Sequence, residues 1–251
     1  MKRFIRSLAV AFVAVFAGQA LFVSAQAAAV KPPKGYVALF NGKNLDGWWG
    51  LKTEDPAKWM ALSSEALAAK KKASLEDVRK HWMVEDGVLV NDGKGLYLST
   101  EKNYGNFELF VDYKTVPGAD SGIYLRGVPQ VQIWDSTKKG GKWKLGADKG
   151  SGGLWNNGGA GAPGRDPLVL ADKPLGQWNT FHITMIEDKV TVVLNDKLVV
   201  DKAPLVNFWD RATPIERRKP LIEKGPIQLQ THGGEIRWRN IFIKELTPSA
   251  D

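Results

Sequence analysis

The stretch ADSGIYLRGVPQVQIWD, residues 119–135, reads as two short β-strands joined by a turn that contains glycine and proline. Side chains alternate between the two faces of a strand. In the first strand, Ile123 and Leu125 therefore share one face. In the second strand, Val131 and Ile133 do the same. The opposite face carries polar and aromatic side chains that are unusual for a packed interior: Tyr124, Arg126, Gln132 and Trp134.

The same alternation recurs along the chain in short segments rich in β-branched and aromatic residues and bounded by Gly, Pro, Asn or Asp. They include YVALFN, WMVEDGVLVN, GLYLST, FELFVDYKT, WNTFHITMI, VTVVLND, PIQLQTH and EIRWRNIFIKEL. In VVLNDKLVV, Asn195 and Asp196 predict the tight turn of a hairpin. Many short strands in a chain of this size predict an all-β sandwich or jelly roll, not a parallel sheet.

Residues 55–82, DPAKWMALSSEALAAKKKASLEDVRKHW, depart from this pattern because they are rich in alanine, leucine, lysine and glutamate. Asp55 followed by Pro56 is typical of a helix N-terminus. Ser74 with Asp77 resembles a capping box. We expect a short insert of one or two helices here, which acts either as a buttress on the edge of the sandwich or as a wall of a binding cleft.

The N-terminal segment MKRFIRSLAVAFVAVFAGQALFVSAQA has a basic start, an apolar middle and a small-residue exit. This pattern predicts a signal peptide over residues 1–28, followed by a single domain over residues 29–251. A membrane anchor is the weaker alternative, because Gly18 and Gln19 interrupt the apolar run. We therefore expect an exported protein, periplasmic or extracellular, with no stable membrane anchor in the mature chain.

Composition excludes several other classes. The chain has no cysteine, which rules out a disulfide scaffold and a lipoprotein anchor. Its net charge is +8, and removing the three basic residues of the signal peptide leaves 32 basic against 27 acidic residues. The basic residues are scattered apart from two runs, 70–72 and 217–219, which are typical of a solvated surface. We expect no nucleic-acid partner.

Polar side chains continue the Tyr124 face onto other predicted strands. In FELFVDYKT, Glu108 and Asp112 alternate with aliphatic residues, and in PIQLQTH, Gln230 and His232 do so. A sandwich buries its aliphatic register between the sheets, so this polar register faces outward. Amide, guanidinium and aromatic groups together suit a sugar, because planar groups bind hydroxyls in pairs and an indole covers the apolar side of a pyranose. Ordinary solvation of an outer face is the alternative.

A long glycine-rich loop set occupies residues 136–173. No strand precedes its glycines and no helix follows them, so they do not indicate a phosphate-binding loop. Long irregular loops in compact domains are usually functional. Trp143 and Trp155 would be costly to leave exposed without a ligand, and we assign Trp155 to the sugar site.

Several of these stretches together resemble the secreted DUF1080 family, the 3-keto-disaccharide hydrolase or 3-keto-glucoside-1,2-lyase/3-keto-2-hydroxy-glucal hydratase domain. They are VALFNGKNLDGW, WMVEDGVLV, YGNFELFVDYK, DSGIYLRG, VQIWD, WNTFHITM and GPIQLQTHGGEIRWRNIFIKEL. The resemblance covers about residues 35–246 in order. It implies a concanavalin A-like jelly-roll β-sandwich with a carbohydrate substrate bound on its concave sheet.

The resemblance also implies a particular chemistry. A sugar oxidised at C3 has an acidic C2 proton, so a base can remove that proton while the glycosidic oxygen leaves C1 by β-elimination. Water then adds to the 2-hydroxy-3-keto-glucal, and the net result is hydrolysis. Such a site needs a base near neutral pKa, a group that stabilises the enolate, and an acid for the leaving group. It does not need the two opposed carboxylates of ordinary glycosidases.

Candidate roles follow from the polar face. His232 is the first choice for base or metal ligand, because histidine titrates near neutrality. Arg126 is the expected clamp on the enolate or a hydroxyl, with a cross-strand ion pair as its alternative. Glu108 and Asp112 are expected as acid or metal ligands. The expected substrate-binding residues are Tyr124, Gln132, Trp134, Gln230 and Trp155.

The remaining candidates leave some questions open. A divalent metal ion held by a carboxylate and His232 could polarise the ketone, but no metal-binding spacing is present and the metal is left unassigned. Asp120 and Ser121 open a strand where they can reach the cleft edge. Gln130 stands where the family commonly has a glutamate, so a carboxylate mechanism at that position is in doubt. A non-catalytic carbohydrate-binding module on the same fold remains the alternative function.

Overall fold

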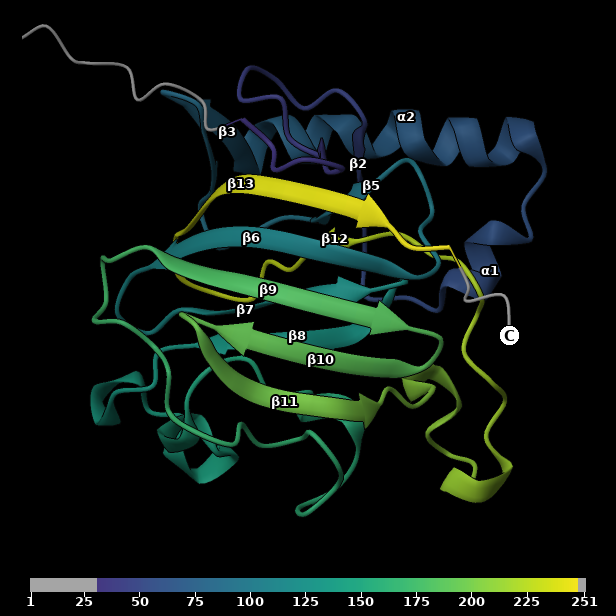
Figure 1. Cartoon of the computed structure of the whole chain (residues 1–251). Coiled ribbons are helices and arrows are strands. Elements are labelled where there is room, and N and C mark those ends of the chain that lie inside the picture. Colours follow the sequence, from purple (N-terminus) through teal and green to yellow (C-terminus); the bar gives the residue numbers. More distant parts are fainter. Residues whose placement is uncertain (1–30, 248–251) are drawn as a thin grey trace, which may run out of the picture.

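The computed structural model describes residues 31–247, which form two antiparallel sheets packed face to face (Figure 1). The larger sheet has eight strands in the order β11-β10-β9-β6-β13-β4-β3, with β1 beside β13. Its strands are β1 (Val37–Ala38), β3 (Trp82–Glu85), β4 (Val88–Asn91), β6 (Phe107–Thr115), β9 (Asn179–Ile186), β10 (Lys189–Leu194), β11 (Lys197–Pro204) and β13 (Ile236–Glu245). The predicted β-sandwich is confirmed, whereas the predicted signal peptide lies outside the described residues.

The smaller sheet has five strands in the order β2-β5-β12-β7-β8. They are β2 (Trp48–Leu51), β5 (Tyr97–Thr100), β7 (Asp120–Leu125), β8 (Val128–Trp134) and β12 (Gln228–Leu229). Two α-helices, α1 (Pro56–Met60) and α2 (Ser64–His81), follow β2. Six short 3₁₀ turns, η1 to η6, lie in the loops at Lys138–Gly140, Trp143–Leu145, Ala147–Lys149, Trp155–Asn157, Phe208–Asp210 and Ile215–Arg217.

The aliphatic register fills the space between the sheets, as the alternation predicts. Ile123 and Leu125 of β7 are fully buried, and so are Val131 and Ile133 of β8. They share one core cluster with Val111 and other residues of the large sheet. Each buried aliphatic side chain contributes about 1.5–3 kcal/mol relative to an exposed one. This burial fixes the register of both sheets and leaves the polar register on their outer faces.

The helical insert at 55–82 is confirmed and begins as predicted. Asp55 caps α1 by accepting a hydrogen bond from the Ala57 amide at 2.9 Å, and Pro56 occupies the first turn. The capping box expected at Ser74 is wrong, because α2 begins earlier, after the N-cap Ser63. Ser74 lies inside α2, where its hydroxyl accepts a hydrogen bond from the Gly50 amide of β2 at 2.9 Å. It therefore anchors the helix to the sheet edge.

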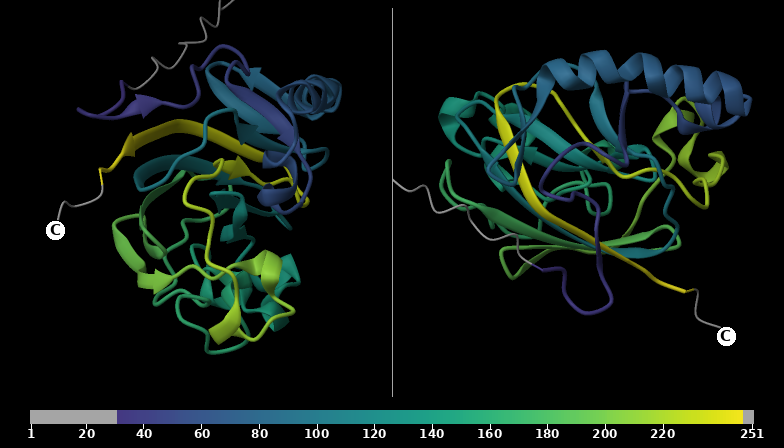
Figure 2. Two further views of the ribbon diagram at one scale, coloured as in Figure 1. Left: turned by 90° about the vertical axis from the view of Figure 1, so that its right-hand side faces the viewer. Right: turned by 90° about the horizontal axis from the view of Figure 1, so that it is seen from above.

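The insert and the long glycine-rich loop flank the outer face of the small sheet. On the β2 side, Trp59 of α1 packs edge-on against Trp49, with ring centroids 5.3 Å apart. On the β8 side, the backbone of residues 152–153 exchanges hydrogen bonds of 2.8 and 2.9 Å with Gln132. Figure 2 shows α2 along one margin of the sandwich and the loop turns at another. The outer face of the small sheet is therefore walled on both sides.

Two hairpins of the sandwich close with tight turns whose central residues have positive φ. Asn195 and Asp196 have φ values of 49° and 64°, which confirms the predicted β10–β11 hairpin. Arg126 and Gly127 form the equivalent turn between β7 and β8, with φ values of 55° and 71°. Because β7 ends at Leu125, strict alternation ends before Arg126.

Among the described residues, no helix is long and apolar enough to cross a membrane.

Candidate functional site

The outer face of the small sheet gathers polar side chains from four strands in register. Gln228 of β12 lies opposite Tyr124 on one side and Ser99 on the other. One step along, the Gln230 amide donates to the Gly122 carbonyl at 2.9 Å, and Gly122 pairs with Gln132. Gly122 is required there because an added Cβ would lie 2.6 Å from the Gln130 side chain. The face is thus a continuous polar layer.

At the end of this layer, Asp120 and His232 form a hydrogen-bonded pair. The Nδ1 of His232 lies 2.8 Å from Oδ2 of Asp120, and the Lys142 ammonium contacts the same oxygen. The Asp120 backbone amide also donates to the Gly233 carbonyl at 2.9 Å, which holds the two segments side by side. The His232 side chain is 59% exposed, whereas that of Asp120 is only 11% exposed. The imidazole is therefore anchored at one nitrogen and open to solvent at the other.

Both groups of this pair titrate away from their ordinary values. Burial raises the pKa of the Asp120 carboxyl, but hydrogen bonds from His232 and Lys142 outweigh burial and hold that pKa below its usual value. The hydrogen bond to Asp120 raises the pKa of His232, against the opposing effects of burial and the Lys142 charge. Asp120 therefore stays ionised at neutral pH and holds a proton on the imidazole.

A chain of hydrogen-bonded side-chain amides ends at the Asp120 carboxylate. The Gln132 side-chain amide donates to Oδ1 of Asp120 at 2.7 Å and accepts from the Gln130 amide at 2.6 Å. Asn156 in turn donates to Gln130 at 2.9 Å. Gln132 is only 3% exposed. Its amide therefore orients the carboxylate of Asp120, and it presents little surface to a ligand.

Gln230 and two tyrosines form a second buried group. The Gln230 side-chain amide donates to the Tyr97 hydroxyl at 3.3 Å, and Thr53 donates to the same hydroxyl at 2.7 Å. The Tyr97 and Tyr124 rings pack edge to face at 5.4 Å, and burial raises the pKa of Tyr124 well above its usual value. The carbonyl oxygen of Gln230 is buried and has no hydrogen-bond partner among the described residues. It is an unsatisfied acceptor inside the polar layer.

The predicted tryptophans also meet on this side of the sheet. Trp134 and Trp155 pack edge to face with ring centroids 6.1 Å apart. Trp134 is 5% exposed, and its indole donates to the Gly150 carbonyl at 2.8 Å. Trp155 is half-buried, and its indole N–H donates a hydrogen bond to the Leu145 carbonyl at 2.8 Å. Trp155 is thus the tryptophan of this pair with ring surface available to a sugar.

Glu108 and Asp112 lie elsewhere, so the expectation that they share this face is wrong. Both belong to β6 of the large sheet, whose polar register points away from the small sheet. Glu108 contacts the Tyr36 hydroxyl, and Asp112 accepts from Thr180 at 2.7 Å and from Arg239 at 3.1 Å. The alternation of β6 was correct, but two sheets have two outer faces and the sequence does not distinguish them.

Arg126 is also absent from this face. Its position in the β7–β8 turn carries the side chain toward the large sheet, where Nε donates to the Gly105 carbonyl at 3.0 Å and Nη2 donates to Asn106 at 3.1 Å. The ion pair with Glu108 or Asp112 considered above does not form either, since neither carboxylate is a partner of Arg126. The sequence-based convergence therefore holds for Tyr124, Gln132, Trp134, Gln230, Trp155 and His232.

A metal site built from His232 with Glu108 or Asp112 is not formed, because the carboxylates lie on the other sheet. Within residues 31–247, no group of three or more His, Asp or Glu side chains is arranged to hold a metal ion. His232 and Asp120 supply two such groups and engage each other. The third charged side chain beside them is Lys142, whose protonated amine has no lone pair to bind a metal ion.

The chain matches the 3-keto-alpha-glucoside-1,2-lyase-like domain over residues 35–244. It belongs to this family. A curated relative, a 3-keto-disaccharide hydrolase of Bacteroides thetaiotaomicron, is 26% identical, and the match spans 84% of this chain and 79% of that protein. The Asp120–His232 end of the polar layer is the candidate active site of this family member.

Two solved structures from Parabacteroides distasonis show the same fold. One "putative glycosyl hydrolase" is 26% identical with a TM-score of 0.55, and the match covers 84% of this chain and 99% of that one. Another is 23% identical with a TM-score of 0.56, and the match covers 85% and 94% of the two chains. The similarity extends over the whole sandwich.

Two residues of this lyase-like domain's candidate site, Tyr97 and Lys142, were not singled out from the sequence, and Asp120 was expected only at the cleft edge, without a role. Asp120 shares the register of Tyr124, four positions on, and that spacing was the available signal. Tyr97 alternates with Leu96 and Leu98 and carried the same signal. Lys142 gave none, because it lies in an irregular loop before η2 and reaches Asp120 only through the tertiary fold.

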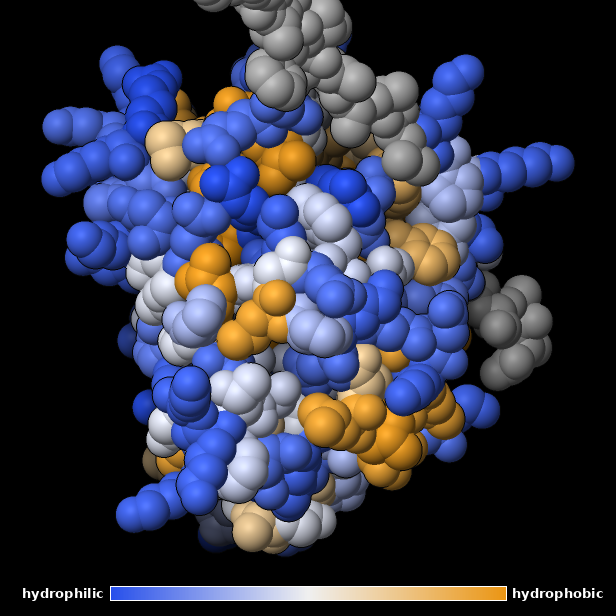
Figure 3. All heavy atoms as spheres, turned by 90° about the vertical axis from the view of Figure 1, so that its left-hand side faces the viewer, coloured by the Kyte–Doolittle hydropathy of each residue, from blue (hydrophilic) through white to orange (hydrophobic). Residues whose placement is uncertain are grey.

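Figure 3 views the molecule from the end at which β13 begins. The loop carrying His232 leads directly into β13, so the candidate site of the lyase-like domain opens at this end. The surface there is mainly hydrophilic, with one compact apolar patch at the lower right and smaller apolar spots elsewhere (Figure 3). Such a surface suits a ligand that presents many hydroxyl groups.

Proposed function

We propose that this chain cleaves the glycosidic bond of 3-keto-glycosides and 3-keto-disaccharides, with His232 as the general base. The observation that carries the proposal is the pairing of a buried, ionised Asp120 with an exposed His232 at 2.8 Å. Family membership supports the substrate class, and the name of the Bacteroides relative supports net hydrolysis.

The pair predisposes the imidazole for proton abstraction. An ionised carboxylate only accepts hydrogen bonds, so Nδ1 of His232 carries the proton and Nε2 carries the lone pair of the neutral ring. Nε2 takes the C2 proton of the substrate, which the C3 ketone has acidified. The electron pair of the C2–H bond forms a C1–C2 double bond as the C1–O bond breaks, and the departing oxygen takes up a proton.

Two neighbouring groups complete the proposed chemistry. Lys142, held at Asp120, places positive charge beside the imidazole, where it stabilises negative charge that develops on the ketone oxygen. The imidazolium formed in the first step supplies the proton for the leaving oxygen. Water then adds across the double bond, its proton to C2 and its hydroxyl to C1, which gives the free 3-keto sugar.

Some side chains of the site are exposed enough to contact a sugar, whereas others are buried and hold the site in shape. Trp155 has ring surface for the apolar side of a pyranose. Gln132, Tyr124, Trp134 and Gln230 are each at most 5% exposed, so we assign them to holding the site in shape. We further propose that the protein is exported to the periplasm or the exterior, on the strength of the basic and then apolar segment at residues 1–28.

The test compares a 3-keto-disaccharide with its parent disaccharide on the purified protein, with release of monosaccharide as the readout. Cleavage of the keto sugar alone is expected. Binding of either sugar without turnover would instead identify a non-catalytic carbohydrate-binding module. For export, the N-terminal residue of the protein recovered from the cell envelope or medium is expected near position 29; recovery of the whole chain from the cytoplasm contradicts export.

A further inference from the structure

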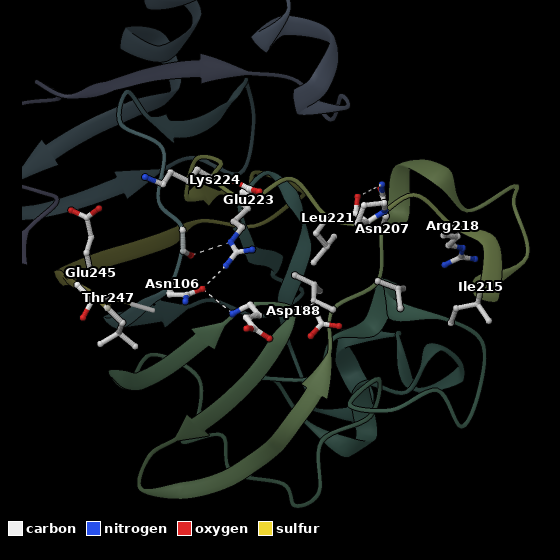
Figure 4. Close-up of a pocket in the computed structure, with 17 residues that line it drawn as sticks. Asn106, Asp188, Asn207, Ile215, Arg218, Leu221, Glu223, Lys224, Glu245 and Thr247 are labelled. Carbon is white, nitrogen blue, oxygen red and sulfur yellow. Dashed lines mark hydrogen bonds between the residues drawn. The ribbon is translucent and has the colours of Figure 1, made fainter. Parts of the chain in front are cut away.

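A large cavity lies away from the Asp120–His232 pair. It has a volume of about 880 Å³ and opens between the ends of the two sheets and the segment that carries η5 and η6 (Figure 4). Gly225 borders the Arg126 backbone at this end, and His232 follows seven residues later, past the end of β12. Seven residues of nearly extended chain span roughly 20 Å. The cavity is therefore separate from the candidate active site.

A buried arginine without a carboxylate partner lines this cavity. Arg126 is 4% exposed, and its three hydrogen bonds go to neutral acceptors: the carbonyls of Gly105 and Ile222 and the side chain of Asn106. Asn106 is itself fixed, because its side-chain oxygen also accepts from the Glu187 amide at 2.8 Å. A guanidinium has five N–H donors, so two remain without a partner among the described residues.

This arrangement leaves Arg126 without a direct ion pair among the described residues. Burial lowers the pKa of Arg126, and the carboxylates of Asp188 and Glu223 oppose that effect from beyond ion-pair distance. A buried cation is costly unless it is paired. Carbonyl oxygens fix its geometry but bring no negative charge. The site is therefore built to hold a guanidinium in one orientation and lacks the anion that normally faces it.

The walls of the cavity restrict what that anion can be. Leu205, Leu221 and Ile215 provide apolar surface, and Arg218 lies at the far side from Asn106 (Figure 4). Arg218 also bonds only to carbonyl oxygens, those of Thr213 and Arg211. Four acidic side chains line the cavity, Glu187, Asp188, Glu223 and Glu245, against the basic Arg126, Arg218 and Lys224, and this balance disfavours a doubly charged ligand such as a phosphate monoester.

We propose that this cavity is a binding site for a small organic carboxylate with an apolar body, whose carboxylate pairs with Arg126. The planar guanidinium fork matches a carboxylate through two N–H donors. The apolar body lies against Leu205 and Leu221, and the single negative charge avoids strong repulsion from the acidic side chains. The site is independent of the proposed cleavage of keto sugars.

The test is calorimetric titration of the whole protein with cyclohexanecarboxylate, cyclohexanemethanol and phenyl phosphate. The carboxylate is expected to bind at least tenfold more tightly than the neutral alcohol and more tightly than the phosphate. Equal binding of acid and alcohol would overturn the proposal, and so would the absence of carboxylate binding. Tighter binding of phenyl phosphate would overturn the assignment to a singly charged acid.

Variants separate this site from general charge effects and from the candidate active site. Arg126→Gln is expected to weaken carboxylate binding at least tenfold, and Leu221→Trp, which keeps Arg126 and fills the cavity from its wall, is expected to do the same. Lys219→Gln removes a neighbouring charge that does not line the cavity, and His232→Ala alters the other end of the sheet; both are expected to bind as the unmodified protein does. Unchanged affinity in Leu221→Trp contradicts the proposal even if Arg126→Gln fails to fold. The proposal is also contradicted if Lys219→Gln or His232→Ala weakens carboxylate binding as much as Leu221→Trp does.

Discussion

His232 and Asp120 are 112 positions apart in the chain, and Nδ1 of one lies 2.8 Å from Oδ2 of the other. The Asp120 amide bonds to the Gly233 carbonyl, so the backbone fixes the distance between the two side chains before any ligand arrives. Lys142 adds a third contact from a separate loop. The arrangement joins a buried negative charge, an exposed imidazole and an ammonium in one small volume.

Replacing His232 by alanine should lower kcat on a 3-keto-disaccharide by roughly 10²–10⁴-fold, the usual contribution of a general acid–base group. The matched control is His182→Ala, since His182 stacks on Phe110 at the outer face of the large sheet, 4.2 Å between ring centroids. The control should retain full activity. Equal losses in the two variants, or none in His232→Ala, would remove His232 from the mechanism.

The pH profile of kcat/KM should report the pKa of His232. A base must be deprotonated, so activity should fall as the pH drops through that pKa. The hydrogen bond to Asp120 raises it, and Asp120→Asn should therefore shift the acidic midpoint to lower pH while lowering kcat. A midpoint that is unchanged in Asp120→Asn would show that another group controls the acidic limb.

The same interaction predicts a pH dependence of folding stability. The pKa of His232 is raised in the folded state above its ordinary value of 6.5, so the stabilisation is fully present below pH 6.5 and is lost as the pH rises through the folded-state pKa. The difference in melting temperature between the unmodified protein and His232→Ala should therefore be larger at pH 5.5 than at pH 9. A difference that grows with pH would contradict the pairing.

Gln230 and Gln132 should respond differently to alanine substitution. Gln132→Ala removes the amide that donates to Asp120, so it should cost about 1–3 kcal/mol in the free energy of unfolding and lower kcat. Gln230→Ala removes one 3.3 Å hydrogen bond to Tyr97 and a buried carbonyl that has no partner among the described residues, so it should cost less stability and leave kcat closer to that of the unmodified protein. Chemical denaturation and steady-state kinetics on both variants test this. The idea fails if Gln230→Ala is the more destabilising of the two.

Gly225 should tolerate no side chain. An added Cβ would lie 2.3 Å from the Arg126 carbonyl oxygen and 2.6 Å from its carbonyl carbon, and backbone atoms cannot rotate away. Gly225→Ala should therefore cost about 1–3 kcal/mol or more in the free energy of unfolding. Gly159→Ala is the control, because nothing lies within 4 Å of the added Cβ. Thermal unfolding of the pair should show a loss only for Gly225→Ala.

Predictions from local pattern were accurate where one strand or helix decided the outcome. Alternation in 119–135 identified the buried register and the outward Gln132, and Asp55-Pro56 marked the start of α1. The Ser74 capping box failed because Ser63 also suits an N-cap, and α2 continues through Ser74, whose hydroxyl bonds to Gly50 of β2. Local propensity does not choose between two adequate caps.

Assignment of residues to the site was less complete, for a geometric reason. Period-two alternation tells which residues of a strand point the same way, but it does not tell which of two sheets the strand joins. Glu108 and Asp112 satisfied the pattern on the wrong sheet. Arg126 satisfied it one residue past the end of its strand, where a positive φ redirects the chain.

The sequence by itself determined the sandwich, the inserted helices and the polar register of the small-sheet strands, because burial of aliphatic side chains is a property of each short segment. Only the tertiary structure decided that Asp120, Lys142 and His232 meet, and that Arg126 faces a cavity. Those contacts depend on strand order and loop path, which place residues far apart in the chain within hydrogen-bond distance.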